Sequence, residues 1–431
     1  STAIRACMHI NRAHRLSIVE DKERRTNMGN SMSEELPETM IALKIDSDNP
    51  KGKITEVPIP EPQPGEALIK VLRAGVCNTD LEIQKGYMGF QGILGHEFVG
   101  IVHSVNASAA QRDAWTWIGK RVCGDINICC QSCDICSLGT DRSRNHCPNR
   151  TVLGILNKDG TMAEYLTLPI NNLHEVPENV SDGDAVFAEP LAAACRIVEQ
   201  NVINFDEDRV AILGDGKLGL MIAEVLGREF LKVQDDAEKS EGIEGKSIPK
   251  PLLLGKHANK MKLVEESGAQ CRNISDCKDE EGNIRPEYTQ QFDVVIDATG
   301  NSAGLAISTS LTRPMGTIVL KSTCASGDLF NAAPFVIDEL KVVGSRCGPF
   351  PKALQLLSIS DDSDETNGDG SAGCCKASSC MKGLNATKYI TRYYPLSQAE
   401  EALAFAAERS TMKVQIICSS LGEVIEENKV A

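Results

Sequence analysis

The sequence predicts a protein of two domains, one rich in β-strands and one of the α/β class with a parallel sheet. Three observations support this fold class. The chain has 431 residues, more than one ordinary hydrophobic core accommodates. Short strand-like runs interrupted by Pro and Gly fill residues 37–185. Beyond them, apolar runs alternate with helical stretches, which is typical of βαβ units.

Composition argues against several other classes of protein. The net charge of −15 disfavours a general nucleic-acid surface, because phosphate binding requires clustered Lys and Arg. No stretch approaches the roughly 20 apolar residues of a membrane helix, so we expect a soluble protein without a membrane partner. Several of the 17 cysteines gather in one tight run, which indicates metal-binding thiolates in a reducing compartment rather than a disulfide framework.

The β-rich domain is expected to be discontinuous along the chain. It opens with the short β-type runs MIALKI, KITEVPIP and EALIKVLRAGVC. The end of the chain, KYITRYYPLSQAEEALAFAAERSTMKVQIIC, has the pattern of a strand, an amphipathic helix and a closing strand. This pattern follows the α/β domain and returns to the first one. We therefore assign residues 37–190 and 340–431 to the β-rich domain.

Residues 191–339 are assigned to the α/β domain. The segment DRVAILGDGKLGLMIAEVLGREFL is an apolar strand, a glycine-rich turn and a helix. The strands KPLLLGKH, QFDVVIDATG and GTIVLKST follow, and helical stretches separate them. Strands that alternate with helices in this way predict a parallel, doubly wound sheet.

Three other segments interrupt this organisation. Residues 234–249 and 358–383 are polar and rich in Gly, so we expect both to be exposed loops. Residues 1–36 form an N-terminal extension whose first 19 residues carry three arginines, two histidines and no acids. This start resembles an organellar transit peptide, with a disordered extension as the alternative. The expected location is cytoplasmic, or mitochondrial or plastid if the extension is a transit peptide.

Four cysteines have the spacing of a closed metal site. Cys130, Cys133 and Cys136 are separated by two residues each, and Cys147 follows after ten more. Four thiolates from one loop bind zinc tetrahedrally at roughly 2.3 Å, with an iron–sulfur cluster as the chemical alternative. A site with four sulfur ligands leaves no open position, so its function is structural.

The hexapeptide GDGKLG predicts a dinucleotide-binding loop. It follows the strand RVAIL and opens a helix, which is the context that a GxGxxG motif requires. Gly214 permits the tight turn, Gly216 lets a pyrophosphate approach the backbone, and Gly219 permits close helix packing. Lys217 and Leu218 complete the loop, whose helix N-terminus presents free N–H groups to phosphates. A nicotinamide cofactor is predicted, with a flavin or another nucleotide as the alternative.

The end of the second strand of this domain indicates which nicotinamide cofactor binds. In NAD proteins an acid there usually binds the ribose hydroxyls. Here Gly255, Lys256 and His257 end the strand, and Lys260 follows. Without a carboxylate to repel a 2′-phosphate, and with cations to bind it, the sequence favours NADP over NAD.

Two more residues are expected at the cofactor side of the sheet. Thr299 lies in DATGN, which ends a strand at the edge where ligands bind in such folds. Arg346, in GSRCGPF, either contacts the cofactor phosphates or pairs with an acid at the domain junction.

The stretch GVCNTDLEIQKGYMGFQGILGHEFVG contains a possible second metal site, at Cys77, His96 and Glu97. Thiolate, imidazole and carboxylate groups all bind zinc in proteins. The motifs GVCNTD, GHEFVG, CxxCxxC, AEPL and GxGxxG, in this order, resemble those of the zinc-dependent medium-chain alcohol dehydrogenases over roughly residues 40–430. The similarity is to the branch of polyol, sugar and threonine dehydrogenases.

The resemblance implies a GroES-like domain that holds the catalytic zinc and a Rossmann domain that holds NAD(P). Cys77 and His96 are then zinc ligands, and Glu97 or Glu189 supplies a carboxylate, directly or through water. The four spaced cysteines correspond to the structural zinc loop, so two zinc ions per chain are expected. The spacing between the third and fourth cysteines is longer than is usual in the family.

The resemblance also implies the chemistry: hydride transfer between NAD(P) and a secondary alcohol, polyol or sugar, whose hydroxyl the zinc activates. Thr79 is expected to take the hydroxyl proton, and Asp80 to support a zinc ligand. Glu82, where ethanol-oxidising relatives have a relay histidine, joins the proton path or is a surface residue. The alternatives are a threonine-type amino-alcohol dehydrogenase and, less favoured, a non-catalytic member of the fold. A small-molecule substrate and a homodimer or homotetramer are expected.

Overall fold

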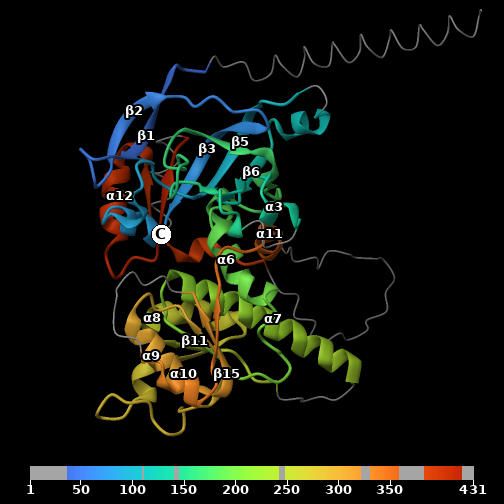
Figure 1. Ribbon diagram of the computed structural model, residues 1–431, viewed down its shortest axis with the longest axis vertical. Coiled ribbons are helices and arrows are strands. Elements are labelled where there is room, and N and C mark those ends of the chain that lie inside the picture. Colours follow the sequence, from blue (N-terminus) through green and yellow to red (C-terminus); the bar gives the residue numbers. More distant parts are fainter. Residues whose placement is uncertain are drawn as a thin grey trace, which may run out of the picture.

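The computed structural model describes residues 36–108, 111–139, 145–241, 248–321, 331–358 and 383–419. The chain folds into two units, which lie one above the other in Figure 1. The N-terminal extension, apart from its last residue, lies outside the described residues, and so does most of the polar segment 358–383. Within the described ranges, no helix combines the length and the apolar character that crossing a bilayer demands.

The upper unit in Figure 1 is built from β-sheets, as the sequence predicts. Its largest sheet has seven strands in the order β10-β6-β5-β3-β18-β17, with β9 paired to β3. A three-stranded sheet, β2-β1-β4, and the pair β7-β8 complete it. The strands are β1 (Thr39–Ile45), β2 (Lys53–Pro58), β3 (Glu66–Val76), β4 (Gly92–Ile93), β5 (Glu97–Val105), β6 (Arg121–Gly124), β7 (Asn127–Ile128), β8 (Thr151–Val152), β9 (Tyr165–Pro169), β10 (Leu173–Glu175), β17 (Ile390–Pro395) and β18 (Lys413–Ile417).

The lower unit contains a six-stranded sheet in which every neighbouring pair is parallel, in the order β13-β12-β11-β14-β15-β16. The central strand β11 is buried along its whole length, which is typical of a parallel sheet covered by helices on both faces. The predicted fold class is confirmed. The strands are β11 (Val210–Leu213), β12 (Leu252–Gly255), β13 (Gln270–Asn273), β14 (Phe292–Asp297), β15 (Thr312–Leu320) and β16 (Lys341–Gly344).

Helices connect the strands and join the two units. The helix α6 lies where the units meet in Figure 1, and it contacts both α7 and β5. Its buried face belongs to a core that continues into the strands of the parallel sheet. The helices are α2 (Asn78–Ile83), α3 (Asp134–Ser137), α5 (Asp182–Ala185), α6 (Ala188–Glu199), α7 (Lys217–Glu241), α8 (Ala258–Met261), α9 (Ser302–Leu311), α10 (Ala333–Ile337), α11 (Phe350–Ser358) and α12 (Ala399–Ala406).

The end of the chain returns to the first unit. Strand β18 pairs with β3 in antiparallel orientation, and Val414 lies opposite Val76. The two partners are more than 300 positions apart in sequence, so the chain passes through all strands of the parallel sheet before its last strand completes the large sheet. This return brings the final strand next to the candidate metal site at Cys77, His96 and Glu97.

Two boundaries differ from those expected. Residues 234–241 are the last turns of α7 rather than a loop, because this stretch includes good helix formers and has no glycine or proline before Gly242. The helix projects from the lower unit in Figure 1. Strand β16 extends the parallel sheet beyond Glu339, where we placed the end of the α/β domain, because it pairs with β15 from Lys341 to Gly344.

Candidate active site

Strand pairing assembles the first cluster. Strand β3 ends directly before Cys77, and β5 begins directly after His96. The two strands are antiparallel, with Gly75 opposite Glu97, so residues distant in sequence meet at one end of the sheet. One ligand atom each of Cys77, His96 and Glu97 lies within 4.8 Å of the others. The structure thus brings together three residues that the sequence singled out.

Asp80 contacts both Cys77 and His96. Its Oδ2 accepts a hydrogen bond from the backbone N–H of Cys77 at 2.8 Å, and its Oδ1 lies 3.4 Å from Nδ1 of His96. Asp80 is fully buried and His96 is 3% exposed. A carboxylate on one ring nitrogen fixes the orientation of a histidine whose other nitrogen binds a metal. Nε2 of His96 is therefore the atom left to bind one.

The charges of the cluster favour a bound cation. Burial alone would lower the pKa of His96, but Asp80 and the Cys77 thiolate raise it well above its usual value. Glu97 forms a buried ion pair with Lys413, the first residue of β18. The groups around His96 therefore stabilise positive charge at the imidazole. A zinc ion with sulfur, nitrogen and oxygen ligands fits this set of side chains.

Glu189 faces the same site from the first turn of α6. Burial raises the pKa of Glu189 to about 7, with His96 lowering it and Glu97 raising it further. Its carboxylate is therefore within electrostatic reach of the cluster, although it does not share the compact arrangement of the three ligand atoms. Glu97 and Glu189 both stay candidates for the carboxylate ligand.

Thr79 and Glu82 lie on α2, directly after Cys77. The hydroxyl of Thr79 is 3.8 Å from Sγ of Cys77, so it lies beside the cluster and is half-buried. Glu82 forms an ion pair with Lys85 at 2.7 Å, and their side chains are 40% and 65% exposed. This geometry supports the surface alternative for Glu82.

The four spaced cysteines form a second compact group in the β7–β8 region. The sulfur atoms of Cys133 and Cys136 are 3.5 Å apart, Cys133 and Cys147 3.8 Å, Cys130 and Cys136 4.0 Å, and Cys130 and Cys147 3.5 Å. Ligands of a tetrahedral zinc at 2.3 Å lie about 3.8 Å apart, so these distances fit the ion. Hydrogen bonds from Ser132 lower the pKa of Cys130 to about 5, whereas burial and hydrogen bonds with Cys133 and Cys147 raise the pKa of Cys136 to about 12.

The glycine-rich loop has the backbone that a dinucleotide requires. Gly214 has a φ of 112°, in a region that favours glycine. A Cβ at Gly219 would lie 1.9 Å from the carbonyl oxygen of Gly214, whereas a Cβ at Gly216 would meet no atom within 4 Å. The loop is therefore closely packed on the helix side and open where the motif approaches a pyrophosphate.

Lys217 links this loop to the metal cluster. Burial and Lys413 lower the pKa of Lys217, while Cys77, Glu97 and Asp80 act in the opposite direction. Lys217 and Lys413 also line a small shared pocket together with Phe187 and Pro190. The glycine-rich loop and the first cluster are thus neighbours across the junction of the two units.

A carboxylate stands at the end of β12, contrary to our expectation. Asp215, the second residue of GDGKLG, accepts hydrogen bonds from the backbone N–H groups of Lys256 and His257. The sequence of the strand end does not reveal this acid, because the acid comes from the neighbouring loop. An acidic residue inside the motif and a glycine at the strand end were the available signals. Lys260, expected to bind a phosphate, instead donates to the carbonyl of Arg409.

The remaining cofactor candidates have local partners. The backbone N–H and the hydroxyl of Thr299 both donate to Asp297, at 2.9 and 2.7 Å, at the carboxyl end of β14. Arg346 donates to the carbonyl of Asn145, beside the four-cysteine group. It therefore joins the parallel sheet to that group through a backbone oxygen rather than through an acid. Lys413 was missed as well, because no local pattern connects it with Glu97.

The fold and these two clusters define a zinc-binding dehydrogenase, and comparison with known proteins agrees. The protein-family model described as the alcohol dehydrogenase GroES-like domain matches residues 63–178. The family model described as zinc-binding dehydrogenase matches residues 251–359. The chain is 30% identical over 349 residues to the erythritol/L-threitol dehydrogenase of Mycolicibacterium smegmatis, covering 76% of this chain and 89% of the relative. The chain belongs to the zinc-dependent medium-chain alcohol dehydrogenase family and is an oxidoreductase.

Other relatives agree with this assignment. The D-arabitol-phosphate dehydrogenase of Enterococcus avium is 25% identical over 375 residues, covering 84% of this chain and 92% of the relative. A solved structure from Sinorhizobium meliloti 1021, described as a zinc-binding dehydrogenase bound to NADP, is 26% identical with a TM-score of 0.67. It is matched over 88% of this chain and 100% of that one. The family and the enzyme class expected from the sequence are confirmed.

Proposed function

We propose that this chain oxidises a secondary alcohol, polyol or sugar at the Cys77–His96 cluster and passes the hydride to a nicotinamide cofactor on the glycine-rich loop. The observation that carries the proposal is the adjacency of the two sites: Lys217 of the loop lines a small pocket together with Lys413, which is ion-paired with Glu97 of the cluster. Hydride transfer requires the donor carbon and the nicotinamide to be in contact. Polyol dehydrogenases among the relatives support this substrate class.

Each residue of the cluster has a proposed role. Cys77 and His96 hold the zinc, Glu97 or Glu189 supplies the carboxylate, and Asp80 keeps the ring of His96 in place. A bound zinc lowers the pKa of a hydroxyl that binds to it. Thr79, which lies 3.8 Å from the cysteine sulfur, accepts the proton that the substrate releases and transfers it towards solvent.

The second zinc is proposed to be structural, and it is held by the four cysteines alone. A complete set of four sulfur ligands leaves no position for a substrate. The hydrogen bond from Arg346 to Asn145 ties this lobe to the lower unit, so a rigid lobe also stabilises the junction of the two units.

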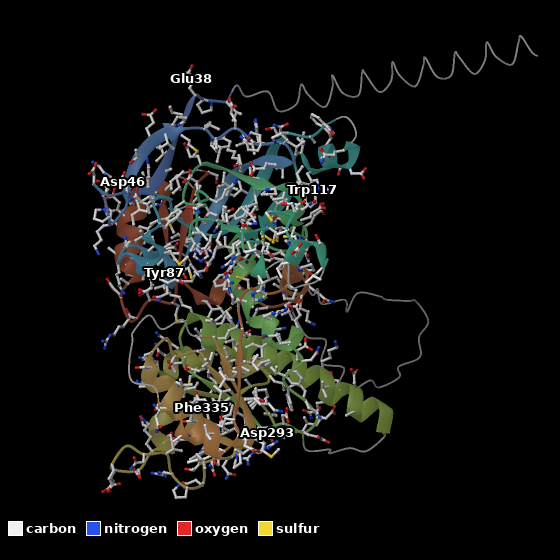
Figure 2. All side chains as sticks on the ribbon, viewed as in Figure 1. Glu38, Asp46, Tyr87, Trp117, Asp293 and Phe335 are labelled. Carbon is white, nitrogen blue, oxygen red and sulfur yellow. The ribbon has the colours of Figure 1, made fainter. Side chains whose placement is uncertain are left out.

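We also propose a homodimer or homotetramer. Strand β16 is an edge of the parallel sheet, and in the described part of the chain it pairs with β15 alone. Large apolar side chains are exposed next to it: Met315 (64%), Val336 (74%), Ile337 (77%) and Val342 (47%). Phe335, which precedes two of them, lies on the lower unit away from the upper one in Figure 2. An unpaired edge with an exposed apolar surface is typical of an interface.

The test is cofactor reduction across a panel of polyols, aldoses, secondary alcohols and L-threonine, with NAD and with NADP. We expect turnover with at least one polyol or secondary alcohol, and its loss when a chelator removes zinc. Turnover of L-threonine alone would establish the amino-alcohol alternative, and turnover that survives zinc removal would contradict the proposal.

Thr79 provides a sharper test within the same assay. The variant Thr79→Val should lower kcat by about 100-fold, which is typical for the loss of a proton-transfer group. Thr79→Ser retains the hydroxyl and should restore most of the activity. Equal rates for the valine and serine variants would contradict the role of the hydroxyl.

A further inference from the structure

Asp215 belongs to the glycine-rich loop, but its side chain lies at the end of the neighbouring strand β12. Its Oδ2 accepts hydrogen bonds from the backbone N–H groups of Lys256 at 2.7 Å and of His257 at 2.6 Å, and it lies 3.1 Å from Nδ1 of His257. The residue is 7% exposed. Burial alone would raise the pKa of Asp215, but the hydrogen bonds from His257 and Lys256 more than offset burial and lower it. The side chain is therefore an ionised, fixed acceptor.

The end of β12 is shaped to receive this carboxylate. A Cβ at Gly255 would lie 2.6 Å from Cβ of Asp215 and 2.7 Å from its Oδ2. Any side chain at Gly255 would therefore displace Asp215. The glycine at the strand end and the acid in the loop are complementary, and together they place one carboxylate between β11 and β12.

This position is the one where a dinucleotide presents its adenosine ribose. In a βαβ unit the pyrophosphate lies on the loop after the first strand, and the ribose lies against the end of the second. Among the described residues, Oδ1 of Asp215 has a single hydrogen-bonding neighbour, Nδ1 of His257 at 3.2 Å. A carboxylate oxygen accepts more than one hydrogen bond, so Oδ1 has capacity left for a ribose hydroxyl.

Binding of a 2′-phosphate at this position would be electrostatically unfavourable. The phosphate carries about two negative charges, and binding would place them next to an ionised carboxylate in a partly buried site. The two backbone N–H groups that could bind it already donate to Asp215. Of the neighbouring basic side chains, His257 faces Asp215 and Lys260 donates to Arg409, whereas the side chain of Lys256 is exposed to solvent. The fold alone does not determine which of the two cofactors binds, since one solved structure of similar fold contains NADP and another contains NADH.

We propose that Asp215, supplied by the glycine-rich loop rather than by the strand end, selects NAD over NADP in this chain. The carboxylate accepts a hydrogen bond from the ribose 2′-hydroxyl and repels a 2′-phosphate. This proposal rests on the proposed function only in placing a nicotinamide dinucleotide on the loop. It replaces the preference for NADP that the cations after β12 suggested.

Equilibrium binding tests the proposal without any turnover. Calorimetric titrations with NADH and NADPH measure the selectivity, and titrations with 5′-AMP and adenosine 2′,5′-bisphosphate measure it on the adenosine half alone. We expect wild type to bind NADH at least about tenfold more tightly than NADPH, with the same order for the two adenosine nucleotides. A wild-type preference for the 2′-phosphorylated members of both pairs would overturn the proposal, whatever the variants do.

The variant Asp215→Asn removes the charge and retains an oxygen that can accept the two backbone N–H groups. It should reduce the NADH preference by about tenfold or more, mainly through tighter binding of NADPH. Asp215→Ser is a second route to the same loss of charge. Glu207→Gln is the matched control, since Glu207 is an exposed acid before the amino end of β11 and loses the same charge. The control should retain the wild-type ratio.

A folded Asp215→Asn or Asp215→Ser protein with an unchanged NADH-to-NADPH ratio would overturn the role of Asp215. Failure of wild type to bind any of the four nucleotides would overturn both this inference and the proposed function. Selective NADH binding without turnover on any alcohol would support Asp215 and contradict the proposed function alone.

Discussion

Gly75 shows how strictly the first metal cluster depends on a single backbone position. It lies opposite Glu97 in the β3–β5 pairing. A Cβ at Gly75 would lie 2.1 Å from Oε2 of Glu97 and 2.8 Å from Cγ1 of Val186, which is fully buried. Neither neighbour can move freely, because Glu97 is paired with Lys413 and Val186 is part of the core. The absence of a side chain at Gly75 therefore allows the Glu97 carboxylate to reach the cluster.

The variant Gly75→Ala should lose the zinc at this cluster and be destabilised by about 1–3 kcal/mol, as is usual for overpacking of a core. The control is Gly344→Ala, because a Cβ there would meet no atom within 4 Å. Zinc analysis and urea unfolding measure both effects. Equal zinc content and equal unfolding free energy in the two variants would contradict this account.

A variant of Cys133 tests whether the four-cysteine group binds a zinc ion. The sulfur of Cys133 lies within 3.8 Å of those of Cys136 and Cys147, so Cys133→Ser should remove one zinc and expose the loop around it to proteolysis. The zinc at the other cluster should remain. Cys271→Ser is the control, since Cys271 is half-buried in the parallel-sheet unit and outside both metal groups. Full zinc content in the Cys133 variant would contradict a structural zinc site.

At the scale of secondary-structure elements, Asp293 holds the starts of three parallel strands together. Its carboxylate on β14 accepts a hydrogen bond from the backbone N–H of Arg209, before β11, at 2.8 Å, and one from the side chain of Arg313 on β15. Burial alone would raise the pKa of Asp293, but the hydrogen bonds from Arg313 and Arg209 lower it below its usual value of 3.8. Because the pKa is lower in the folded state, the carboxylate stabilises the fold above this value and ceases to do so as the pH falls through the folded pKa.

The variant Asp293→Asn should therefore cost about 1 kcal/mol at pH 7, with the exposure of Arg313 keeping the effect small. The difference from wild type should shrink as the pH falls below 3.8 and through the folded pKa, where the wild-type group also loses its charge. Thermal unfolding of both proteins across this pH range measures the difference. A difference that stays constant or grows on acidification would contradict the role assigned to the carboxylate.

Local patterns account for most of the elements and for much of the site. The runs MIALKI and KITEVPIP became β1 and β2, and GDGKLG became the turn before α7. Cys77, His96 and Glu97 were found because they lie in one short stretch. Their partner Lys413 was not, since its contact with Glu97 depends on the pairing of β18 with β3 and leaves no trace in either segment.

Two sequence-based expectations failed because each considered one segment in isolation. Segment 234–249 has a loop-like composition, but its first part, 234–241, lacks glycine and proline and forms the end of α7. The expectation that no carboxylate lies at the end of β12 considered this strand without the loop after β11, which supplies Asp215. Parallel pairing of β11 and β12 brings the two together.

At the scale of the whole molecule, the active site depends on the junction of the two units. In the view of Figure 2, Tyr87 lies on the upper unit close to the lower one, whereas Asp293 and Phe335 lie on the lower unit. The cluster belongs to the upper unit, and Lys217 reaches it from the lower one. The relative placement of the two units therefore sets the distance between the cluster and the glycine-rich loop.

Association of whole chains is predicted to use the exposed edge of the parallel sheet. Ile337→Asp places a charge on the most exposed large apolar side chain among the described residues, so it should shift the protein towards the monomer. Leu138→Asp is the control, because Leu138 is 54% exposed on the four-cysteine lobe instead. Analytical ultracentrifugation measures both. Identical sedimentation of the two variants would contradict an interface at this edge.

We propose that Cys77 and His96 hold a catalytic zinc beside the cofactor loop, separate from the zinc of the four cysteines. The most direct test is the zinc content per chain of wild type, His96→Asn and His103→Asn, with the rate of cofactor reduction measured on the same preparations. The account predicts two zinc ions in wild type and in the His103 control, which lies on β5 outside both metal groups. It predicts one zinc and a rate at least about 1,000-fold lower in His96→Asn. Two zinc ions and an unchanged rate in His96→Asn would contradict it.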